Sequence, residues 1–156
     1  MNRVLLILLL IPFLLFSQPP EYSYQIIASN NGLKFPALLP ILGTQLSNNE
    51  GSSSIANSSG NLLFYSDGVK VWNGSNVQLP NGFGLLGNNS TTQSCIIVKQ
   101  PGLNSNYYIF TAPETSTLNN ATYSIIDLSV GDLISKNNSI AATTESLSFA
   151  YHCNGV

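Results

Sequence analysis

Turn sequences recur at short intervals from residue 52 onwards, and they limit what this chain can fold into more than any other feature. Asp67-Gly68 is a pair preferred in two-residue β-hairpins, and Asn73-Gly74 marks the next turn. The segments between such turns are too short for helices and rich in strand-forming side chains. The first three predicted strands are residues 54–56, 62–66 and 69–72. They predict an antiparallel meander.

The rest of the chain follows the same pattern. The further predicted strands are residues 94–99, 107–111, 121–128, 133–134 and 146–152. A Gly- and Asn-rich connection is expected over residues 75–93. Residues 18–51 are expected to be irregular apart from a short strand at 25–27, because their prolines discourage regular structure. Since no window beyond the first 17 residues shows a helical period, the sequence predicts an all-β fold.

A repeat organises these strands. A strand, a turn and a strand rich in aromatic residues occur at 55–65 and again at 96–110, so that Asn61 and Asn106 stand 45 residues apart. Residues 149–155 begin a third copy. Modules of about four strands at this spacing are typical of β-propeller blades. A β-sandwich with irregular spacing is the alternative.

The third copy leads to an expectation about the whole protein. The chain has room for about two and a half blades, whereas a propeller typically needs about 4–8. We therefore expect an incomplete β-propeller over residues 52–156, forming the amino-terminal part of a longer protein or an incomplete gene product. The alternative is a small, self-contained sandwich whose last strand ends the protein.

The first 17 residues have the organisation of a secretory signal peptide. Arg3 supplies a positive charge, residues 4–16 form an apolar stretch expected to be helical, and Ser17 is a small residue at a cleavage point. The stretch is shorter than the roughly 20 residues that span a bilayer, which disfavours an uncleaved anchor. The sequence thus predicts a secreted or cell-surface protein that meets the membrane only during export.

Composition excludes two further classes of protein. Charged residues make up 8% of the chain and the net charge is −2, so the basic face that nucleic acid requires is missing. Aromatic residues are distributed throughout the body of the chain, which argues against disorder. A polar but weakly charged surface fits an exported protein.

Few residues are suited to acid–base or metal chemistry. His152 is the only histidine, and it is expected to bond the adjacent turn rather than to serve a Ser-His-Asp site. Asp67 and Asp132 each neighbour a glycine and are expected to form turns. No catalytic, cofactor-binding or metal-binding residue is predicted, and the sequence favours a protein that is not an enzyme.

Cys95 and Cys153 are the only two cysteines. A pair of cysteines in an exported protein can form a disulfide, provided that the Cα atoms come within about 7 Å of each other. The alternative is that both are small buried apolar residues. Trp72, with Tyr65 and Phe64, can likewise be either a carbohydrate platform or part of the core, and alternating aromatic residues in a meander favour the core.

Residues 50–156 resemble, in order, the amino-terminal β-propeller-like region of large secreted surface proteins of gliding Bacteroidetes-type bacteria. The matching segments are residues 61–68 with 71–73, 79–82, 92–98, 101–102, 107–111, 123–127 and 152–155. The resemblance implies export, often with type IX secretion, and in some members adhesion-type repeats. The resemblance implies no catalytic residues in this chain.

Three functions follow as expectations. The first is a non-enzymatic exported surface protein that acts as a binding or interaction scaffold in adhesion or gliding motility, with an unknown surface protein or glycan as its partner. The second is the amino-terminal part of a secreted hydrolase acting on polysaccharide. The third is a stand-alone structural β-sandwich.

Overall fold

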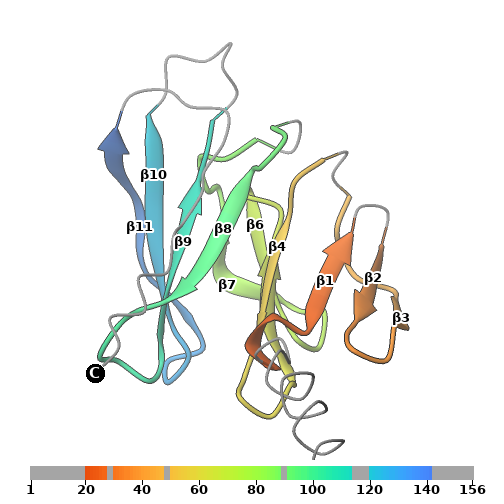
Figure 1. Cartoon of the computed structure of the whole chain (residues 1–156). Coiled ribbons are helices and arrows are strands. Elements are labelled where there is room, and N and C mark those ends of the chain that lie inside the picture. The colour runs from red at the N-terminus through yellow and green to blue at the C-terminus, as the bar shows by residue number, and fades with distance from the viewer. Residues whose placement is uncertain (1–19, 28–29, 48–49, 89–90, 114–119, 142–156) are drawn as a thin grey trace, which may run out of the picture.

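The computed structural model describes residues 20–27, 30–47, 50–88, 91–113 and 120–141 (Figure 1). These residues form three antiparallel sheets and contain no α-helix, which confirms the predicted all-β class. One turn of 3-10 helix, η1 (Pro20–Tyr22), precedes the first strand. No helix in the described part of the chain has the length and apolar character to cross a membrane. The predicted signal peptide at 1–17 and the predicted strand at 146–152 lie outside the described residues.

Each sheet is a meander of strands that follow one another in the sequence. Sheet A contains β1 (Tyr24–Ile27), β2 (Asn31–Lys34) and β3 (Leu39–Leu42). Sheet B contains β4 (Ser53–Ala56), β5 (Leu62–Ser66), β6 (Lys70–Asn73) and β7 (Gln78–Phe83). Sheet C contains β8 (Cys95–Lys99), β9 (Asn106–Thr111), β10 (Ala121–Asp127) and β11 (Asp132–Ala141).

Three expectations about these elements were wrong. Residues 18–51 are not irregular, because they contain the whole of sheet A. The connection predicted at 75–93 contains β7, and the short strand predicted at 133–134 is the ten-residue β11. Pro40, which argued against regular structure, lies in β3, and Pro80 lies in β7. Both strands are at the edge of their sheets, where a backbone N–H that faces away from the sheet is not needed for the ladder.

The predicted hairpin at Asp67-Gly68 joins β5 to β6. One carboxylate oxygen of Asp67 accepts hydrogen bonds from the backbone nitrogens of Val69 (2.8 Å) and Lys70 (2.6 Å). Gly68 has φ 86°, in the left-handed region that a glycine adopts without a steric cost. Both residues therefore have the turn-forming roles that the sequence predicted.

Sheet B is the middle layer of the molecule. Its face towards sheet C carries Ile55, Phe64 and Val71, which pack with residues such as Ile109 and Ile126 into the larger apolar core. Its opposite face carries Tyr65 and Trp72, which form a second core with Ile26 and Leu46. In Figure 1 the three sheets accordingly lie in the order C, B, A across the molecule.

The first strands of the three sheets lie next to one another (Figure 1). Serine hydroxyl groups at β4 connect them. Ser52 Oγ and Ser54 Oγ donate to the carbonyl oxygens of Ile26 (2.6 Å) and Tyr24 (2.8 Å) of β1. On the other side, Ser53 Oγ accepts a hydrogen bond of 3.1 Å from the backbone nitrogen of Ile97 in β8. β4 and the residue before it are thus bonded to both neighbouring sheets by three consecutive serines.

Side chains also join the last strands of sheets B and C. The Asp132 carboxylate accepts hydrogen bonds from the backbone and side-chain nitrogens of Asn81, at 2.9 and 2.7 Å. Lys136 Nζ donates to the carbonyl oxygen of Phe83 at 2.9 Å and lies 4.7 Å from the centre of that ring. Sheets B and C are therefore held together along both sides of the apolar core between them.

Glycines allow the backbones of sheets B and C to approach closely at one end. A Cβ on Gly68 would lie 2.9 Å from the carbonyl oxygen and 3.0 Å from the Cβ of Ser94. The backbone nitrogen of Gly87 donates to the Gly68 carbonyl oxygen at 3.0 Å. Ser94 Oγ donates to the Gly51 carbonyl oxygen at 2.6 Å. The turn between β5 and β6 is therefore enclosed by the segment that leads into β8.

Candidate functional site

Two described aspartates beyond Asp67, Asp127 and Asp132, also serve local structure. Asp127 Oδ1 accepts hydrogen bonds from the backbone nitrogen and the hydroxyl of Ser129, and these bonds lower the pKa of Asp127. Asp132, predicted to form a turn, follows Gly131 at the start of β11 and binds Asn81. Within the described residues no group of three or more His, Cys, Asp or Glu side chains can hold a metal ion. His152 lies outside these residues.

Cys95 lies in the core between sheets B and C. Its side chain is buried, and Sγ lies 3.4 Å from the carbonyl oxygen of Ser66, to which it donates. Burial is the main reason why the pKa of the Cys95 thiol is raised from 9.0 to about 12. Cys153 lies outside the described residues, so a bridge between the two cysteines stays a prediction.

The raised pKa makes stability depend on pH. Below pH 9 the thiol is protonated in both the folded and the unfolded chain. Between pH 9 and about 12 the unfolded chain loses this proton first, so the free energy of unfolding falls by up to about 1.4 kcal/mol per pH unit. Urea unfolding in a reducing buffer at a series of pH values measures the slope. Because burial also raises the pKa values of Tyr65 and Tyr107, the Cys95→Ala variant isolates the contribution of the thiol. Equal slopes for the two proteins would contradict the prediction.

The aromatic residues considered as a carbohydrate platform are buried. Phe64 and Tyr65 have no exposed surface and Trp72 is 6% exposed. The ring of Phe64 meets that of Tyr107 edge-on at 5.4 Å, and Tyr65 stacks on Trp72 at 5.4 Å. The platform alternative is therefore wrong for these three residues, and the prediction that they belong to the core is confirmed.

A different aromatic surface lies on the face of sheet C that points away from sheet B. Here alternate residues of β8, β9 and β10 are apolar and half-buried. The strand register aligns them in two rows, Val98–Tyr108–Ile125 and Ile96–Phe110–Tyr123. We call these six side chains the outer face of sheet C. Sheet C thus carries apolar side chains on both of its faces.

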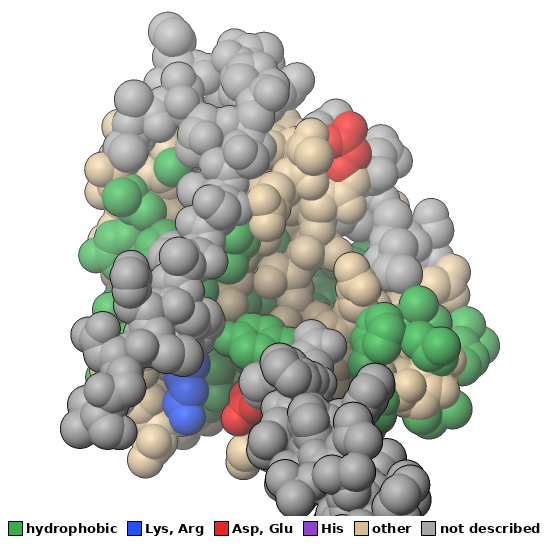
Figure 2. Space-filling view, in the orientation of Figure 1, with side chains coloured by type: hydrophobic (Ala, Val, Ile, Leu, Met, Phe, Trp, Pro, Cys, Tyr) green, Lys and Arg blue, Asp and Glu red, His purple; other side chains and the backbone are tan. Residues whose placement is uncertain are grey.

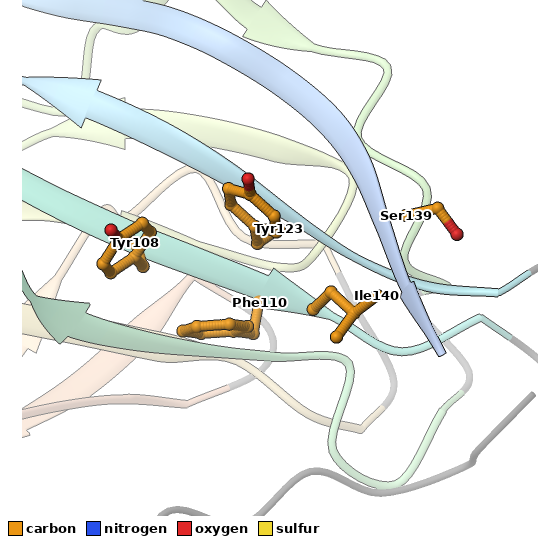
Figure 3. A pocket seen from close by; sticks show the side chains of 5 residues that line it. All are labelled: Tyr108, Phe110, Tyr123, Ser139 and Ile140. Carbon is orange, nitrogen blue, oxygen red and sulfur yellow. The ribbon is translucent and has the colours of Figure 1, made fainter. Parts of the chain in front are cut away.

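A pocket of about 400 Å³ opens on this outer face (Figure 3). The rings of Tyr108, Phe110 and Tyr123 surround it, with ring centres 5.7 to 6.2 Å apart. Ile140 of β11 lies beside Phe110, whereas the hydroxyl of Ser139 is turned away from the three rings (Figure 3). The pocket is lined by uncharged side chains, which suits an apolar or neutral contact rather than acid–base chemistry.

A second pocket, of about 500 Å³, lies between sheets A and B. Tyr24, Lys34 and Leu39 line it from paired positions on β1, β2 and β3. Leu62 at the start of β5 and Asn76 in the turn after β6 line the opposite wall. The space-filling view shows hydrophobic side chains gathered over β3, close to this pocket, where Leu39 and Leu42 are exposed (Figure 2).

The sequence carried a partial signal for the first of these two sites only. The alternation at 121–128 indicated a half-buried strand, and its partly exposed residues Tyr123 and Ile125 belong to the outer face of sheet C. Nothing in the sequence places Lys34 opposite Asn76, because the two residues meet only through the packing of sheet A on sheet B.

Comparison of this chain with protein-family models, with curated proteins and with solved structures finds no match.

Proposed function

We propose that this chain belongs to an exported, non-enzymatic surface protein that acts as a binding scaffold in adhesion or gliding motility, and that its sheets are neighbouring blades of a β-propeller. The observation that carries the proposal is the contact of the first strands β1, β4 and β8. In a propeller, consecutive four-stranded meanders stack face to face around an axis with their first strands nearest to it. The ordered resemblance of residues 50–156 to secreted surface proteins supports the same view.

The connections between the strands favour blades over a sandwich. Sandwiches of the immunoglobulin type exchange strands between their sheets through Greek-key connections. In the described residues every sheet uses only consecutive strands, and no strand crosses from one sheet to another. The apolar outer face of sheet C also supports this arrangement, because sheet B, which has two apolar faces, is covered on both sides.

The use of the carboxylates supports a binding role over a hydrolase. Glycosidases need two carboxyl groups facing a common cleft about 5–10 Å apart. Asp67 and Asp127 instead bind their own turns, and Asp132 binds Asn81. Both described pockets lack an acidic lining residue. No observation in the described residues favours a polysaccharide-cleaving site.

The product of the complete gene, expressed in a Gram-negative host, tests the proposal. We expect its amino terminus to begin at Gln18, and we expect the protein on intact cells to be accessible to added protease. We also expect it to bind isolated cell envelopes or extracellular polysaccharide without releasing reducing ends. A protein that stays inside the cell with residues 1–17 still attached would contradict export. Release of reducing ends would establish the hydrolase instead, and a failure to bind either material would favour a structural role.

A further inference from the structure

The pocket between sheets A and B has the geometry of a small-molecule site. Its volume of about 500 Å³ is within the range of about 300–1,000 Å³ that is usual for such sites, and it lies where two packed modules meet. Sheet A supplies one wall and the start of β5 with the turn after β6 supplies the other.

Lys34 brings a positive charge to this pocket. Its side chain is half-buried, and Nζ lies 5.0 Å from the centre of the Tyr24 ring. Such a cation–π contact holds the ammonium group in place without neutralising its charge. Among the described residues no acidic side chain forms an ion pair with Lys34. The pocket therefore carries a positioned cation in a protein whose net charge is −2.

Asn76 adds hydrogen-bond donors with a fixed orientation. The Tyr65 hydroxyl accepts a bond from the backbone nitrogen of Gln45 at 3.0 Å, so its own hydrogen goes to Asn76 Oδ1 at 2.8 Å. Since burial raises the pKa of Tyr65, this hydroxyl remains a donor across the physiological range. The Oδ1 atom of Asn76 is thus engaged, whereas its side-chain nitrogen, Nδ2, has no partner among the described residues. That nitrogen is available to a ligand.

The chemistry of the walls selects the ligand class. One ammonium group and neutral amide donors match a single carboxylate. Phosphate sites instead use several cations, a helix N-terminus or a row of backbone N–H groups, and the described lining of this pocket has none of these. Leu39, Ile41 and Leu62 supply an apolar wall suited to the C–H face of a sugar ring.

We propose that the pocket between sheets A and B binds a uronic-acid unit of an acidic polysaccharide, with its carboxylate held by Lys34 and Asn76 and its ring against Leu39 and Leu62. The inference rests on the proposed binding role and names the ligand of one site. It does not need the propeller arrangement.

Titration calorimetry of the full-length gene product with oligogalacturonate tests this site, and the methyl ester of the same oligosaccharide is the matched ligand without charge. We expect Lys34→Gln to weaken binding of the acid by about 10-fold or more, which is the loss of one charge-assisted hydrogen bond. Lys70→Gln removes an exposed lysine that does not line the pocket, and it should bind as the wild type does.

Asn76→Asp gives a second variant that keeps the fold. Aspartate tolerates the left-handed backbone of this position (φ 63°) and still accepts the Tyr65 hydrogen bond, but it places a negative charge in the pocket. We expect it to abolish binding of the acid with an unchanged melting temperature. Equal binding of acid and ester, or equal effects of the two lysine variants, would overturn the proposal. Equal affinity for free acetate would overturn the saccharide assignment. Binding of neutral polysaccharides only would overturn this inference and leave the binding scaffold intact.

Discussion

Replacing Phe64 by alanine is expected to lower the free energy of unfolding by about 3–5 kcal/mol, the cost of truncating a fully buried phenylalanine. Phe64 has no exposed surface and lies in the core between sheets B and C. Its ring also contacts Tyr107 edge-on at 5.4 Å. Alanine leaves a cavity that the two sheets cannot close, because they are fixed to each other by hydrogen bonds at both sides. Urea unfolding followed by far-ultraviolet circular dichroism measures the loss.

Phe83→Ala is the matched control for this variant. Phe83 is on β7 of the same sheet but is 51% exposed, so the same truncation should cost less than about 1.5 kcal/mol, including the lost contact with Lys136. Equal losses for the two variants would contradict the position of Phe64 in the core.

The second large effect is expected for Gly68→Ala, at roughly 2–4 kcal/mol. About 1–2 kcal/mol comes from the left-handed backbone, where an L-residue is strained, and a similar amount comes from the collision of the new Cβ with Ser94. The substitution should loosen the contact between the β5–β6 turn and the segment entering β8. Faster hydrogen exchange at the amide nitrogen of Ala112, which donates to the Ser94 carbonyl oxygen, would report this loosening.

Gly102→Ala separates the two causes. Gly102 has φ 78° but has nothing within 4 Å of the position where a Cβ would stand. Its replacement should therefore cost only the backbone strain of about 1–2 kcal/mol and should leave exchange at Ala112 unchanged. If the free energy of unfolding falls equally in both variants, the close approach of Ser94 to Gly68 does not contribute to the cost of Gly68→Ala.

Local chemistry made sheets B and C largely predictable. The strand at 62–66 has the predicted bounds, and the hairpin at Asp67-Gly68 follows from two residues whose turn preferences act over a few bonds. The strands at 94–99, 107–111 and 121–128 differ from β8, β9 and β10 by one residue at an end. Alternation of apolar residues specifies such strands without any knowledge of their partners.

The elements that were missed depend on partners distant in the sequence. β7 contains Pro80 and β3 contains Pro40, and only their positions at the edges of sheets make these prolines acceptable. β11 is rich in polar residues, and its length depends on pairing with β10 and on bonds from Lys136 and Asn137 to the end of β7 and the residue after it. The two pockets are assembled from several strands each, so the alternation in one strand indicated a partly exposed face but neither pocket.

The serines at 52–54, of which Ser53 and Ser54 belong to β4, have a consequence for aggregation. A strand at the edge of a sheet exposes backbone groups that recruit strands from other molecules, and this is a common route to aggregation. In β1 and β8, carbonyl oxygens and an amide nitrogen at such positions are already occupied by the hydroxyls of Ser52, Ser54 and Ser53. Backbone groups that are bonded to these hydroxyls are not available to a strand of another molecule. The serines thus protect these strand edges from pairing between molecules.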